Sequence, residues 1–187
     1  MPIRFPDEAF SGGNGAEKYL RINKIKDMPG RQVRIRILSE PIVGREAWDE
    51  NNKPWRGVDD IDLNAKMAEA GAKIRVEKDK KNPKDFAAMW VRNITTGTTQ
   101  VISIVQKTIW ESIKSYANDD EWGDVSEYDF IISQSEEGGK VSYTVKPCKP
   151  TKLDDAALAV WARISEECVG LDALFHNGNP FDLWSSK

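Results

Sequence analysis

The clearest structural signal in the sequence is the strict alternation within residues 32–38, QVRIRIL. Apolar and basic side chains follow one another in the order Val33, Arg34, Ile35, Arg36 and Ile37. Because successive side chains of a β-strand point to opposite faces, this pattern predicts a strand with one apolar face in a core and arginines on the other. Segments 86–105 and 127–147 alternate in the same way on both sides of a turn, and they predict two hairpins.

Three other segments carry helix signals. Residues 59–71 and 153–170 have aspartates in their first turn and end at a glycine, and residues 106–117 have apolar side chains near helical spacing. Segments 19–25 and 39–48 favour further extended structure. Short strands with one helix between two hairpins predict a mainly β, α+β protein: an oligonucleotide-binding (OB) type of Greek-key β-barrel with a C-terminal helix. The alternative is an α+β sandwich with helices on one face.

Glycine and proline divide the chain into three parts. Residues 1–16 are rich in both and predict a flexible N-terminal arm. Residues 17–170 are expected to form the barrel domain with its C-terminal helix. Residues 171–187 lack a regular pattern and form a C-terminal segment.

Composition excludes several classes of protein. The chain of 187 residues has no apolar run long enough to cross a bilayer and begins with no hydrophobic leader, so we expect a cytoplasmic protein. Two cysteines, Cys148 and Cys168, are too few for a disulfide framework. His176 is the only histidine, so no metal site and no cofactor are expected.

The net charge of −3 hides an asymmetry along the chain. Residues 1–100 hold 19 Lys and Arg against 15 Asp and Glu, whereas residues 101–187 hold 8 against 15. Between Lys18 and Arg36 there are seven basic residues and one acid, Asp27. Such blocks indicate a basic binding face and an acidic remainder. A solvated strand and loop surface is the other explanation.

The strand predicted at 86–93 bears on the same question. If its core face holds Ala87, Met89 and Val91, an aromatic and basic face with Trp90 and Arg92 lies outside. The reverse assignment would bury Arg92, which costs free energy unless the arginine is paired. For the arginines of residues 32–38, protection of a sheet edge is the alternative to binding. Basic residues interleaved with aromatics suit single-stranded nucleic acid, because phosphates need cations and unpaired bases need π surfaces.

The order of motifs over residues 18–147 resembles the single-stranded-DNA-binding proteins of tailed bacteriophages. The most specific pieces are QVISIVQKTIWESI at 100–113, and EWGDVSEYDFII at 121–132 followed by YTVKP at 143–147. The resemblance implies an OB barrel that coats transient single strands during DNA replication, recombination and repair, and an acidic C-terminal segment that recruits partners. Some relatives hold zinc, but this sequence lacks the ligands, so no metal is carried over.

The resemblance also implies a set of DNA contacts at basic and aromatic positions. These candidates are Arg21, Lys24, Lys26, Arg34, Arg36, Trp48, Trp55, Arg56, Trp90 and Arg92. Trp48 and Trp55 flank the loop DENNKP, and we expect one of the two to be a hydrophobic lid instead of a stacking surface.

Apolar residues near the C-terminus need a surface to cover them. Leu174 and Phe175 are expected to pack back onto the barrel or the last helix. The stretch after NGNP is expected to be a detachable tail that binds a replication or recombination protein. Its partner-binding candidates are Phe181, Asp182, Leu183 and Trp184.

The sequence supports an enzymatic function less well than a binding function. The acidic runs DDID at 59–62 and NDDEWGD at 118–124 are better explained as helix caps and loops, and no phosphate-cradling glycine motif is present. We therefore expect a binding protein and no enzyme. The second hypothesis is a phage protein-interaction or regulatory module whose acidic C-terminal half is the working surface.

Overall fold

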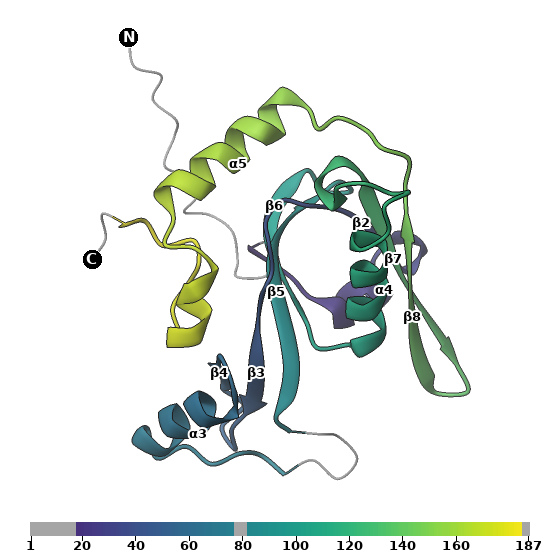
Figure 1. The fold of residues 1–187 in the computed structure, drawn as a ribbon. Helices are drawn as coiled ribbons and strands as arrows, with labels where there is room; N and C mark the ends of the chain where they lie inside the picture. Colours follow the sequence, from purple (N-terminus) through teal and green to yellow (C-terminus); the bar gives the residue numbers. More distant parts are fainter. Residues whose placement is uncertain (1–17, 77–81, 185–187) are drawn as a thin grey trace.

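The computed structural model describes residues 18–76 and 82–184. In this part of the chain a mixed α+β fold is built round one curved, eight-stranded sheet (Figure 1). The strands are β1 (Tyr19–Leu20), β2 (Gln32–Ile37), β3 (Ile42–Trp48), β4 (Pro54–Gly57), β5 (Lys84–Asn93), β6 (Thr98–Ile104), β7 (Asp129–Glu137) and β8 (Lys140–Pro147). The α-helices are α3 (Asp60–Glu69), α4 (Lys107–Ala117) and α5 (Asp155–Glu167). Short 3-10 helices are η1 (Ile22–Asp27), η2 (Pro29–Arg31), η3 (Val125–Glu127) and η4 (Leu171–His176).

The sheet follows the order β1-β6-β5-β2-β7-β8, and β3 branches from β5 to pair with β4. All neighbours are antiparallel except β1 and β6. Helix α4 packs against β6 and β8, which lie toward opposite ends of this path, so the helix fills the side where the sheet does not close. The α+β class and the C-terminal helix are confirmed, whereas the sheet of the described residues is not a closed barrel.

The principal core lies on the concave side of the curved sheet. The apolar residues that alternate along β2 and β5 point into it, together with Ile109 and Ile113 of α4. Of the expected core face of β5, Met89 and Val91 lie in this core, and the third residue, Ala87, is buried as well. Burial of these period-two side chains is the favourable term that holds the sheet against α4.

A second core lies on the opposite face of β5 and β6. There Phe86, Ala88 and Trp90 meet residues of α5, η4 and the segment that follows them. In Figure 1 these C-terminal elements lie on the side of β5 away from α4. Strand β5 is consequently buried on both faces, because the C-terminal segment covers the face that a single layer would leave to solvent.

The β3–β4 hairpin and α3 form a small third cluster at one end of the sheet (Figure 1). Trp55 packs there with Leu63 and Met67 of α3. Gly44 and Gly57 make the close packing possible, since a Cβ on Gly44 would collide with the carbonyl oxygen of Gly57. A residue without a Cβ is therefore needed at position 44, where the two backbones approach closely. Gly44 is paired with Phe86 in the β3–β5 ladder.

Most predicted elements agree with the structure, and one strand is wrong. Only Tyr19 and Leu20 of the expected strand 19–25 are extended, and η1 follows. The reason is that Ile22 and Ile25, three residues apart, are both buried, which is a helical spacing. The arm expected at residues 1–16 lies outside the described residues.

Candidate nucleic-acid interface

The arginines of β2 do not form an open basic stripe. Arg36 is 2% exposed and donates to the Asp129 carboxylate at 2.7 Å. It also donates to the backbone carbonyls of Ser126 and Thr151. Arg34 is more open but bonds the other oxygen of Asp129 at 2.6 Å. Both arginines lie on the face opposite the core, as the alternation predicted, but β7 and the segments round it supply partners for their guanidinium groups.

The aromatic side of β5 is likewise covered. Trp90 is 4% exposed and lies with its ring centroid 4.6 Å from that of Phe181. Trp55 is 7% exposed and donates from Nε1 to Asp49 at 2.9 Å. Arg92 is half-buried beside Thr99. The expected outward placement of Trp90 is therefore wrong, and Trp55 is buried in the cluster that the β3–β4 hairpin forms with α3.

A groove of about 650 Å³ brings other predicted residues together. Its floor is the outer side of β6 around Ser103, with β1 and η1 on one side and the β3–β4 hairpin on the other. The C-terminal segment closes one end with Leu174, Asn177 and Gly178. We call this hollow the β1–β4 groove. Of the predicted DNA contacts, it contains Arg21, Trp48 and Arg56.

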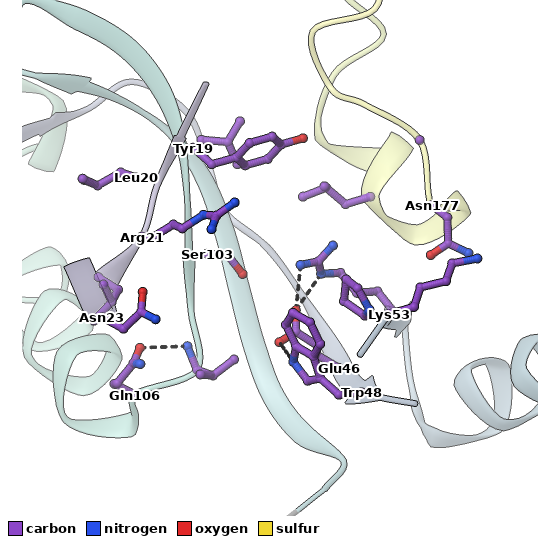
Figure 2. A pocket seen from close by; sticks show the side chains of 17 residues that line it. Tyr19, Leu20, Arg21, Asn23, Glu46, Trp48, Lys53, Ser103, Gln106 and Asn177 are labelled. Carbon is purple, nitrogen blue, oxygen red and sulfur yellow. Dashed lines mark hydrogen bonds and ion pairs between the residues drawn. The ribbon is translucent and has the colours of Figure 1, made fainter. Parts of the chain in front are cut away.

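Arg21 is the most available cation of the groove. It is exposed, and in the described part of the chain it is the one arginine whose side chain makes no hydrogen bond or ion pair. Figure 2 shows Arg21 and Ser103 pointing into the groove, with Trp48 and Lys53 on the opposite side. Lys53 is exposed, and its Nζ lies 4.3 Å from the ring centroid of Trp55. An arginine with all its donors open is suited to phosphate oxygens.

The hairpin wall owes its chemistry to strand alternation. In the β3–β4 register Glu46 faces Arg56, and Trp48 faces Pro54, so these four side chains share the groove side. The indole of Trp48 is half-buried, and Asn82 holds its backbone by hydrogen bonds to both the N–H and the carbonyl. Among the described lining residues, the charged side chains are the cations Arg21, Lys53 and Arg56 and the carboxylate Glu46.

Tyr19 connects the groove to the C-terminal segment. Its hydroxyl lies 3.4 Å from Oδ1 of Asn179, and its ring packs edge-on against Phe181. Burial raises the pKa of Tyr19, while the positive charge of Arg56 opposes that shift. The phenol is accordingly neutral at physiological pH and adds a π surface and a hydroxyl without charge.

The remaining predicted basic residues lie apart from the groove lining. Lys24 and Lys26 are exposed on η1, one turn beyond Arg21. Nζ of Lys24 lies 3.7 Å from Oδ2 of Asp27. They extend the basic surface beyond Arg21 along the chain.

The C-terminal segment packs more closely than the sequence indicated. Phe181 is buried against Trp90 and Tyr19, and the backbone N–H of Val169 donates to the Asp182 carbonyl. The segment expected to detach is therefore packed at Phe181, because the side of β5 away from the principal core offers this ring an aromatic pocket. Leu174 and Phe175 pack back as expected. Leu183 and Trp184 are exposed by 38% and 59%.

Sequence reasoning missed several groove residues. Tyr19, Asn23, Glu46, Lys53 and Gln106 all line it. The alternation of β3 places Glu46 on the same side as Trp48, and this was the one signal from which it could have been found. The contribution of the distant β6 and η4 had no local signal.

Comparison with protein-family models, curated proteins and solved structures gives no match for this chain. Over residues 18–76 and 82–184 no helix is long and apolar enough to cross a membrane. The same residues contain no cluster of three or more His, Cys, Asp or Glu side chains arranged for a metal ion.

Proposed function

We propose that this protein binds single-stranded DNA in the β1–β4 groove without strong sequence preference. The observation that carries the proposal is the guanidinium of Arg21, which has no partner among residues 18–76 and 82–184 and faces a groove whose other wall presents Trp48 and Lys53. The cations attract phosphates, and the indole offers a surface on which any base can stack. No catalytic step is part of this function.

The arrangement of strands supports the proposal. An OB barrel is a partly open Greek-key barrel of five strands whose ligands bind over strands two and three and the adjoining loops. We assign β2, β5, β6, β7 and β8 to those five strands, with α4 between the third and fourth. The groove then lies on the third strand, β6, and is bordered by the hairpin that connects the first strand to the second. This is the expected ligand face of that fold.

Within this function the residues have separate roles. Arg21 and Lys53 bind phosphates from opposite sides, and Trp48 stacks on a base. Lys24 and Lys26 guide the strand beyond the groove. We propose that the protein coats transient single strands during phage DNA replication, recombination and repair in the host cytoplasm, and belongs with the phage proteins that its motifs resemble.

One observation favours an alternative function, protein recruitment. Leu158 and Val160 of α5 are each 40% exposed, and Trp184 is exposed by 59%. Acidic side chains of the same C-terminal half lie in the same segments, including Asp155 and Asp182. A protein that worked only through these segments would show little affinity for oligonucleotides.

Titration with single-stranded oligonucleotides tests the proposed function directly. Intrinsic tryptophan fluorescence should be quenched on binding, duplex of the same sequence should bind more weakly, and the logarithm of affinity should fall linearly with the logarithm of salt concentration. Arg21→Ala should lower the salt slope by about one phosphate contact. Arg163→Ala removes the same charge from α5, outside the groove, and should leave the slope unchanged. Equal affinity for duplex, or a flat salt dependence, would refute the proposal.

A further inference from the structure

Glu46 is an unexpected residue for a groove that binds a polyanion. It is the only carboxylate among the described lining residues, and it is 7% exposed. Burying a carboxylate costs free energy unless partners compensate it. If Glu46 only repelled the phosphates of DNA, it would weaken binding. The hydrogen-bond partners of its carboxylate give another reason for its position in the groove.

Each oxygen of Glu46 holds a different groove side chain. Oε2 accepts from Nε of Arg56 at 2.8 Å and lies 2.7 Å from a terminal guanidinium nitrogen of the same residue. Oε1 accepts from Nε1 of Trp48 at 3.2 Å. Figure 2 shows Trp48 and Glu46 adjoining at the hairpin wall. One buried carboxylate therefore fixes both the indole and the guanidinium that border the groove.

The geometry of the strands makes this arrangement rigid. Glu46 faces Arg56 directly across the β3–β4 ladder, and Trp48 follows two residues later on the same face. Charge-assisted hydrogen bonds of this kind restrict rotation of both side chains. The guanidinium also lies 5.5 Å from the ring centroid of Phe86, which limits its movement on the other side.

We propose that Glu46 is a positioning residue for nucleic-acid binding, an inference that rests on the proposed function. It holds the Trp48 indole in the plane on which a base stacks, and it neutralises Arg56. Arg56 then contributes orientation and its remaining N–H donors, whereas Arg21 and Lys53 supply the charge that displaces counterions. The groove therefore binds one unpaired base together with a neighbouring phosphate.

The positioning role and simple repulsion predict opposite changes in single-strand affinity for Glu46→Gln. The amide keeps one acceptor oxygen but turns an NH₂ group toward the other donor, so either Trp48 or Arg56 loses its partner. We expect single-strand affinity to fall about ten-fold, which corresponds to one hydrogen bond to a charged group. The amplitude of tryptophan quenching should fall with it, and the salt slope should not decrease. Tighter or unchanged binding by this variant would overturn the proposal.

Two further variants make the result decisive. Glu50→Gln removes an exposed carboxylate from the adjacent turn, outside the groove lining, and should leave affinity within about two-fold of the unmodified protein. Arg56→Lys keeps the charge but loses the planar fork that Glu46 holds, so it should weaken binding with no change in salt slope. If Glu46→Gln has a much lower melting temperature than the unmodified protein, Arg56→Lys becomes the test of the positioning role. Wild-type affinity in Arg56→Lys would also overturn the proposal.

Failure of this inference is distinguishable from failure of the proposed function. If the unmodified protein shows no salt-dependent binding of single strands, both are wrong. If it binds with the expected slope but neither variant weakens binding, only the positioning role is wrong.

Discussion

Arginines and tryptophans come together in two regions, and the structure treats the two oppositely. On the face formed by β2 and β5, Arg36 is bonded to Asp129 and Trp90 is covered by Phe181. In the β1–β4 groove, Arg21 has no partner within the described part of the chain, and Trp48 remains half-buried. The β2–β5 face has the more regular sequence pattern, whereas the groove has the side chains that are open to a ligand.

The difference shows that residue type is a weaker guide to binding than what covers the residue. A buried guanidinium with a carboxylate and two carbonyls as partners stabilises the fold but has little left to offer a phosphate. An exposed guanidinium with no partner contributes little to stability and can exchange water for phosphate oxygens. The tryptophans differ in the same way, since Trp90 fills a core and Trp48 faces a hollow.

The largest expected effect comes from removing the counterion of the β2 arginines. Asp129→Asn should lower the free energy of unfolding by about 3–5 kcal/mol, because it leaves the buried Arg36 without a charged partner. Chemical denaturation measures this directly. Asp85→Asn provides the control, since Asp85 is 93% exposed where it pairs with Arg45, and it should cost less than about 1 kcal/mol. Should Asp129→Asn instead keep its stability and bind DNA more tightly, the β2–β5 face would be the interface after all.

The next effect separates the two tryptophans. Trp48→Ala should weaken single-strand binding by about 1–3 kcal/mol while the protein still melts cooperatively. Trp90→Ala should instead destabilise the fold by about 3–5 kcal/mol, because it opens a cavity in the second core. Fluorescence titration and thermal melting of both variants give the comparison. Wild-type affinity in a folded Trp48→Ala protein would contradict stacking in the groove.

The smallest expected effect concerns the support of the hairpin wall. The hydrogen bond from Trp55 Nε1 and the backbone N–H groups of Lys53 and Asn51 lower the pKa of Asp49. A lowered folded pKa means that the stabilisation is present above the ordinary value for Asp, about 3.9, and is lost as the pH falls through the folded value. Asp49→Asn should therefore reduce the melting temperature by about 2–4 °C at neutral pH.

The pH dependence supplies the check on that prediction. The difference in melting temperature between the unmodified protein and Asp49→Asn should be constant between about pH 5 and 8 and should shrink below about pH 4. A difference that grows as the pH falls would show that the Asp49 carboxylate does not stabilise the hairpin.

The sequence predicted the fold well wherever the signal was local. The alternation of β2, the two hairpins and the helices α3, α4 and α5 all lie where the pattern placed them. The exception, η1, arose because Ile22 and Ile25 fit alternation poorly and fit a three-residue repeat. The candidate site was predicted only in part, since Arg21, Trp48 and Arg56 line the groove and Trp55, Trp90 and Arg36 are buried.

By itself, the sequence determined which side chains share a face, because a strand turns each successive residue to the opposite side. The tertiary structure alone decided which faces stay open. Arg36 meets Asp129 from 93 residues away, and Phe181 reaches Trp90 from the far end of the chain. Among the residues that the structure describes, β6 and the β3–β4 hairpin bring no free carboxylate to Arg21. Glu46, the one acid of the described groove lining, is already held by Arg56 and Trp48. Such pairings depend on long-range packing, and no local pattern encodes them.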